Sequence, residues 1–200
     1  MTSILTGDII NSRKVDSQIW LPILKGTLIK YGTTPKTWEI YRGDSFQLEV
    51  EPTAALLAAI HLKSSIKQIA SLDIRLGIGV GEKDHNSPKI TESNGEAFVH
   101  SGEAFNRLNN KKTLALITPS SSINEQMELA IDLALLTMNN WPVNAAHYIQ
   151  ASIEHPDWKQ LQLAKHLGKS QGTISQSLIR AGFEDIMKLE KRYRELITNL

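Results

Sequence analysis

The 200-residue sequence predicts an α+β protein, in which an α/β sandwich is followed by an all-helical segment. As far as about residue 120, short runs of alternating apolar residues, typical of strands, lie between stretches with helical spacing. Beyond that point only helical spacing is found. The tail also combines a small residue, a glycine and apolar residues at offsets typical of two short helices joined by a tight turn.

The first elements are a strand at Ser3–Ile10 and a helix at Ser17–Tyr31 with an apolar stripe. Alternation over Thr37–Glu51 then predicts a β-hairpin. Gly43 and Asp44 lie between its halves, and a glycine in first position suits a two-residue turn of type II′.

The next elements are an alanine-rich helix at Pro52–Ser71 and an alternating strand at Asp73–Gly81. A short helix is expected within Glu96–Asn109 and an apolar strand at Thr113–Thr118. The order is β-α-β-β-α-β with a further helix and strand, and it predicts a ferredoxin-like α/β sandwich.

Two helices, at Ile123–Asn139 and Val143–His155, are expected to connect this sandwich to the tail. The predicted division is therefore a sandwich domain at 1–120, connecting helices at 121–156 and a tail domain at 157–200.

The composition excludes several classes of protein. There is no cysteine, which excludes a disulfide scaffold, a thiol nucleophile and a cysteine zinc site, and which fits a cytoplasmic location. No secretion signal or membrane-length apolar run is found.

Residues 157–200 contain eight Lys/Arg against five Asp/Glu, whereas residues 1–156 contain fourteen against sixteen. The basic tail is therefore the better partner for a polyanion.

Residues 160–182 have the spacing of a helix-turn-helix DNA-binding unit. Ala164 is small where the first helix must approach the second closely. Gly168 suits a turn that needs a positive φ, and Ser170 suits the N-cap of the second helix. Ile174 then returns to the core.

This frame leaves the start of the second helix exposed, as a recognition helix requires. Polar side chains there can contact base edges, and flanking cations can hold phosphates. The residues expected to contact duplex DNA are Lys169, Ser170, Gln171, Thr173, Ser175, Gln176 and Arg180. The alternative is an ordinary helical hairpin used for packing or dimerisation.

Asp8 follows the first strand and Asp44 lies at the hairpin tip, so the predicted topology can bring both carboxylates to one sheet edge. Two neighbouring carboxylates repel unless a cation separates them, and Mg²⁺ suits such a sparse oxygen site. Backbone amides from Ile9 to Ser12 can cradle phosphates. The alternative is that each aspartate stabilises its own turn.

The glycines of Gly77-x-Gly79-x-Gly81 lie within a strand rather than before a helix, so they do not form a dinucleotide fingerprint. They predict a close backbone approach in the sheet. Trp38 and Tyr41 can stack on a base, but burial in the sandwich is the favoured interpretation.

Four segments resemble the core of class III nucleotidyl cyclases and GGDEF-type polymerase palms. They are Leu5-Thr-Gly-Asp-Ile-Ile-Asn-Ser-Arg13, Tyr41-Arg-Gly-Asp-Ser-Phe46, Arg75-Leu-Gly-Ile-Gly-Val-Gly81 and Gly102-Glu-Ala-Phe-Asn106. The whole chain, with its tail, is similar to the bacterial SatD family.

The resemblance implies that Asp8 and Asp44 bind the metal and that Asn106 matches the cyclase asparagine near the ribose. The positions expected to bind a nucleotide are Ile9, Asn11, Ser12 and Asn106. Cyclases place an arginine four residues beyond that asparagine, where this chain has Asn110, so the charge that stabilises the transferred phosphoryl group is missing from its usual place.

The sequence therefore predicts a cytoplasmic, SatD-like DNA-binding regulator that acts as a homodimer and whose palm-like domain binds a nucleotide with Mg²⁺. A first alternative is an active nucleotidyl cyclase or nucleotidyltransferase, which transfers a phosphoryl group and carries an accessory helix-turn-helix. A second is an inert palm that serves as a dimerisation scaffold.

Overall fold

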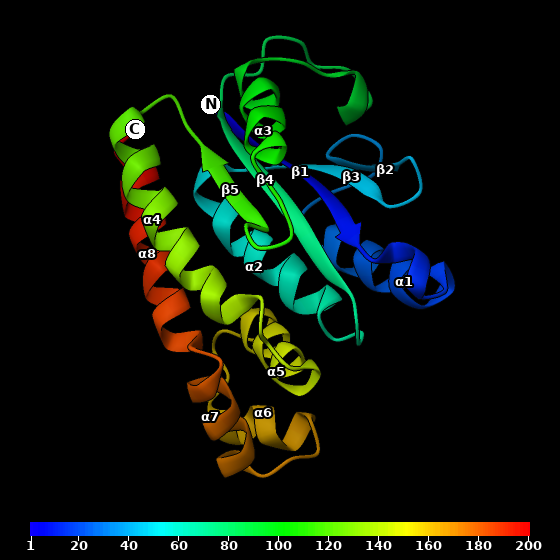
Figure 1. The fold of residues 1–200 in the computed structure, drawn as a ribbon, viewed down its shortest axis with the longest axis vertical. Helices are drawn as coiled ribbons and strands as arrows, with labels where there is room; N and C mark the ends of the chain where they lie inside the picture. The colour runs from blue at the N-terminus through cyan, green and yellow to red at the C-terminus, as the bar shows by residue number, and fades with distance from the viewer.

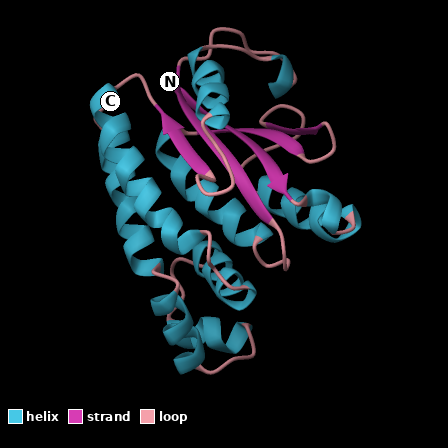
Figure 2. Cartoon of the chain, viewed as in Figure 1, coloured by secondary structure: helices cyan, strands magenta, loops and turns pink.

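The computed structural model describes residues 1–200 and contains a five-stranded mixed sheet and eight α-helices (Figures 1 and 2). The strands are β1 (Thr2–Ile10), β2 (Trp38–Tyr41), β3 (Ser45–Val50), β4 (Asp73–Gly81) and β5 (Leu114–Ile117). The helices are α1 (Ser17–Leu28), α2 (Ala55–Ile66), α3 (Glu96–Asn106), α4 (Ser121–Met138), α5 (Val143–Glu154), α6 (Gln160–His166), α7 (Gln171–Arg180) and α8 (Phe183–Thr198). Single turns of 3₁₀ helix occupy Ser12–Lys14, Pro52–Ala54 and Ile90–Glu92.

The sheet has the order β2-β3-β1-β4-β5. All neighbouring strands are antiparallel except β4 and β5, which are parallel. The central strand β1 pairs with both β3 and β4, so Asp8 lies opposite Ser45 on one side and Arg75 on the other. The predicted order of strands and helices is observed.

The two faces of the sheet are covered differently. Alternate residues of β4, such as Ile74 and Leu76, enter the large core with α1 and α2. The intervening glycines lie against α3. A Cβ on Gly79 would lie 2.1 Å from the backbone nitrogen of Ser101, so only glycine lets α3 approach this closely. The glycine pattern therefore reflects a helix lying directly on the strand.

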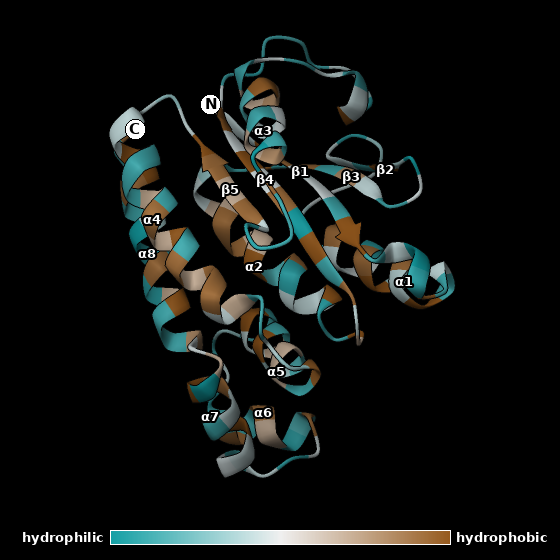
Figure 3. Ribbon diagram, viewed as in Figure 1, coloured by the Kyte–Doolittle hydropathy of each residue, from teal (hydrophilic) through white to brown (hydrophobic).

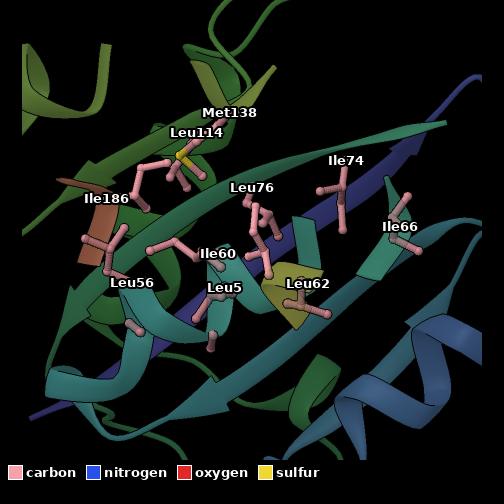
Figure 4. Close-up of a cluster of buried hydrophobic side chains, with 14 of the residues drawn as sticks. Leu5, Leu56, Ile60, Leu62, Ile66, Ile74, Leu76, Leu114, Met138 and Ile186 are labelled. Atoms are coloured by element: carbon pink, nitrogen blue, oxygen red, sulfur yellow. The ribbon is translucent and has the colours of Figure 1, made fainter. Parts of the chain in front are cut away.

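One hydrophobic core extends from the sheet into the C-terminal helices. Figure 4 shows side chains from β1, α2, β4, β5, α4 and α8 in a single cluster. Helix α8 returns from the tail to the sheet region, where the hydroxyl of Tyr193 donates to the carbonyl oxygen of Pro52 (2.6 Å). Trp141 Nε1 donates to the carbonyl oxygen of Ala181 after α7 (2.9 Å). The tail is thus held to the rest of the protein just after α7 and again along α8.

The structure corrects two local predictions. Tyr41 pairs with Ser45, so the hairpin turn contains three residues rather than two. Arg42 and Gly43 both have positive φ, 51° and 88°, so the turn is not the type II′ turn that was expected. Helix α2 ends at Ile66, and Ser71 adopts a left-handed conformation (φ 73°) that a continuing helix would not allow.

Trp38 is buried, as expected, and its Nε1 donates to the carbonyl oxygen of Gly32 (3.1 Å).

None of the helices combines the length and apolar character that crossing a membrane requires.

Candidate functional site

Two regions contain the residues that the sequence singles out. One is the end of the sheet at which β1 leaves it. The other is the pair formed by α6 and α7, which lies away from the sheet at one end of the molecule (Figure 1).

At the sheet end, Asp8 forms an ion pair with Arg75 on the neighbouring strand. Arg75 Nε donates to Asp8 Oδ1 (2.9 Å) and Nη2 donates to Oδ2, so both carboxylate oxygens are occupied. The guanidinium also lies 5.8 Å from the ring centroid of Phe105 on α3. Hydrogen bonds to Asp8 raise the pKa of Arg75, which keeps it charged.

Asp44 belongs to the same cluster. It is the last residue of the hairpin turn, and Ser12 donates its hydroxyl to Asp44 Oδ2 (2.5 Å). The charge of Asp44 contributes, after that of Asp8, to raising the pKa of Arg75. The two aspartates that the sequence pairs are therefore brought together around a guanidinium, and Arg75 is the cation that reduces their mutual repulsion.

No set of three or more His, Cys, Asp or Glu side chains lies close enough together to hold a metal ion. The oxygens of Asp8 and Asp44 suit Mg²⁺ chemically, and such an ion takes its other ligands from water and phosphate. Because Arg75 occupies Asp8, this arrangement fits a metal only if the guanidinium withdraws.

The predicted nucleotide contacts are only partly gathered here. Ile9 is buried in the core and pairs with Ile74, so its side chain is not available to a ligand. Beyond Asp8, β1 has no further partner in β3. Asn11 is left-handed (φ 63°) and donates its amide to the carbonyl oxygen of Ser71 (2.9 Å). Ser12 is therefore the one predicted nucleotide contact that directly touches an aspartate.

Asn106 is exposed at the end of α3. Its neighbour Phe105 lies under Arg75, and the backbone of Phe105 lies against Gly77. This packing brings Asn106 to the same end of the sheet as Asp8.

Sequence reasoning gave Arg75 no role, and it expected Tyr41 to be buried in the sandwich, where the structure leaves it half-buried. Burial raises the pKa of Tyr41, the charge of Arg42 lowers it, and the charge of Asp8 raises it. For Tyr41 the available signal was its place three residues before Asp44. For Arg75 only the strand register shows that it faces Asp8.

Helices α6 and α7 have the expected turn between them. Gly168 has a φ of 60°, and the amide of Lys169 donates to the carbonyl oxygen of Ala164 (3.0 Å). Ser170 caps α7, because its hydroxyl accepts from the backbone nitrogen of Thr173 (3.1 Å). Ile174 is buried, so the opposite side of α7 faces outward.

The predicted DNA contacts lie on or just before this outward side, with one exception. Six of them are exposed: Lys169, Ser170, Gln171, Thr173, Gln176 and Arg180. Ser175 is half-buried and borders a groove shared with Trp158 and Phe183, so it lies at the margin of the exposed face.

Arg180 Nη2 lies 3.4 Å from Gln176 Oε1, to which it donates. Both side chains, with Thr173, border a second groove against the corner between α4 and α5, near Asn140. Ile179, which sequence reasoning missed, is 74% exposed on the same outward side.

Comparison with protein-family models gives no match, and comparison with curated proteins gives none either.

Proposed function

We propose that this protein is a DNA-binding regulator and that α6, the turn and α7 form a helix-turn-helix unit, as in the SatD family it resembles. The observation that carries the proposal is the capped helix α7, which follows a turn through Gly168 and exposes Gln176 between flanking cations. Glutamine can read adenine in the major groove, and Lys169 and Arg180 can hold the backbone phosphates on either side.

The test is fluorescence anisotropy of the full chain with duplex DNA over a range of salt concentrations. Replacing Lys169 or Arg180 with alanine should weaken binding to all sequences alike and reduce the salt slope by about one each. Lys25→Ala, which removes an exposed lysine from α1, is the matched control and should change neither. Absence of salt-sensitive binding in the wild type would refute the proposal.

For the first 120 residues we propose a ferredoxin-like, palm-like domain. The support is the strand order β2-β3-β1-β4 with α1 and α2 on one face, followed by the additional β5. A nucleotide would bind at the sheet end, with Mg²⁺ between its phosphates and the carboxylates of Asp8 and Asp44. Arg75 would then leave Asp8 and become free to contact a phosphate, because a guanidinium suits either partner.

Calorimetry with each nucleoside triphosphate and Mg²⁺ tests this second site. Asp44→Asn should abolish Mg²⁺-dependent binding, and Asp84→Asn, on an exposed loop, is the control. Equal affinity in wild type and Asp44→Asn would exclude the site. Product formation in the same mixtures would favour the alternative of an active cyclase or nucleotidyltransferase, whereas neither binding nor product would favour an inert scaffold.

The regulatory part of the proposal rests on a chain of packed helices. The hydroxyl of Tyr31, just after α1, hydrogen-bonds with His61 Nδ1 on α2 (2.9 Å). His61 Nε2 in turn lies 3.0 Å from Glu154 Oε1 on α5, and α5 packs against α7. If the two sites are coupled, nucleotide changes DNA affinity by the same factor as DNA changes nucleotide affinity. Calorimetry of the nucleotide with and without DNA measures this factor, and equal values would leave the two sites independent.

A further inference from the structure

Helix α4 is apolar on two opposite sides. One side is buried in the shared core through Met127, Ile131 and Leu135. The other exposes three leucines at i, i+4 and i+7, namely Leu129, Leu133 and Leu136, which are 65%, 58% and 69% exposed. Hydrophobic residues accordingly recur along α4 in Figure 3. A surface helix normally has one apolar stripe, and a second one indicates a second partner.

We infer that the exposed leucine stripe of α4 is the interface of a homodimer, in which α4 pairs antiparallel with α4 of a second copy about a two-fold axis beside Leu133. The choice of a second copy rests partly on the proposed function, because helix-turn-helix units act in pairs on two half-sites. The chemistry of the stripe supports the same choice.

The stripe is self-complementary. An axis beside Leu133, midway between residues 132 and 133 along the helix, places Leu129 of one copy opposite Leu136 of the other, and the reverse. The contact therefore closes on itself as an isologous interface requires. A groove bordered by Lys111 and Asn139 lies beside Leu136, on the side away from α7. It can receive a leucine of the partner helix as a knob into a hole.

The charges beside the stripe fit the same arrangement. Glu128 and Asp132 are both paired with Lys112 of their own chain, at 2.6 and 3.3 Å. Glu125 would face Asn140 of the second copy. Asp132 lies beside the axis and approaches its own counterpart, and the Lys112 bound to each Asp132 supplies the opposite charge there. A parallel register would set Glu125 against its own counterpart.

The experiment measures the mass of the full chain in solution by light scattering after size exclusion. The wild type should be a dimer, and Leu133→Glu should be a monomer. Leu161→Glu is the matched control, because Leu161 is 67% exposed on α6 but lies outside the stripe, and it should remain a dimer. Mixing Leu133→Glu with Leu133→Lys should restore a dimer, since opposite charges then meet at the axis. Circular dichroism should show an unchanged fold for each variant, because Leu133 points away from the core.

A monomeric wild type would overturn the inference, and so would a Leu133→Glu variant that remains a dimer. Failure of the Glu and Lys variants to pair would overturn the two-fold register at Leu133. If Leu133→Glu misfolds, Leu133→Gln takes its place under the same criteria. Anisotropy separates this result from the proposed function: a monomer that still binds DNA overturns only the dimer, and a dimer that binds no DNA overturns only the regulator.

Discussion

Replacing Gly79 with alanine should destabilise the protein strongly, because α3 lies directly on this glycine. The new Cβ would lie 2.1 Å from the nitrogen of Ser101 and 2.2 Å from the carbonyl oxygen of Ala97. Ordinary carbon contacts need roughly 3.5–4.0 Å. Both atoms belong to the backbone, so no side-chain rotation can relieve the clash, and α3 must move away from the sheet. Overpacking of this kind costs about 1–3 kcal/mol, and we expect a loss of about 3 kcal/mol of unfolding free energy.

For a chain of this length, that loss corresponds to a fall in Tm of roughly 6–12 °C. The matched control is Gly102→Ala, because Gly102 is in α3 itself and its added Cβ meets nothing within 4 Å. Alanine there should stabilise the helix by up to about 1 kcal/mol. Urea and thermal denaturation measure both variants. A Gly79→Ala protein as stable as the wild type would refute the argument, as would equal losses in the two variants.

Three further variants test the anchoring and titration of the fold. Ser170→Ala should cost about 1 kcal/mol by removing the cap of α7, and amide exchange should show earlier opening there than in α4. Tyr193→Phe should cost about 0.5–1.5 kcal/mol in urea denaturation, because Pro52 loses its hydrogen bond; no change would show that the anchor is unimportant. Burial lowers the pKa of Lys63 to about 8 from its ordinary 10.5, so between these values the unfolded chain binds more protons and stability should rise with pH. Denaturation at pH 8 and 10 should show this rise in the wild type and not in Lys63→Met.

Hydrophobic spacing predicted the strands and helices well, because their apolar faces are set by local periodicity. The hairpin turn was mispredicted because two of its residues, Arg42 and Gly43, adopt a positive φ. Glycine takes such a φ readily, but a residue with a Cβ such as Arg42 rarely does, so the sequence offers no reason to expect it there. Local preference pointed to a two-residue loop, and the pairing of Tyr41 with Ser45 overrode it. The helix before β4 was predicted too long, because its composition continues to favour helix where the chain must already turn toward the sheet.

The sheet-end site shows a different limit. The sequence identified Asp8 and Asp44 as a pair, but Arg75 lies within an alternating strand and looks there like an ordinary exposed residue. Its role depends on the register between β1 and β4, since a shift of one residue would turn it to the other face of the sheet. Long-range pairing of this kind is decided by packing of the whole sheet.

The shared core bears on how the proposed regulator would work. A tail connected by a flexible linker would move independently of the sheet. Here Trp141 holds the residue that follows α7, α8 is bonded to the sheet region, and α7 packs against α5. In the proposed mechanism, binding at the sheet end would replace the contact between Arg75 and Asp8 with contacts to a ligand, and a resulting shift of α1 would reach α5 through His61 and Glu154. Because packed cores favour discrete arrangements over gradual deformation, such a shift would change the placement of α7 as a whole. His61→Leu, which removes the polar link between α2 and α5, should therefore leave DNA affinity in the absence of nucleotide unchanged and reduce the effect of nucleotide on it.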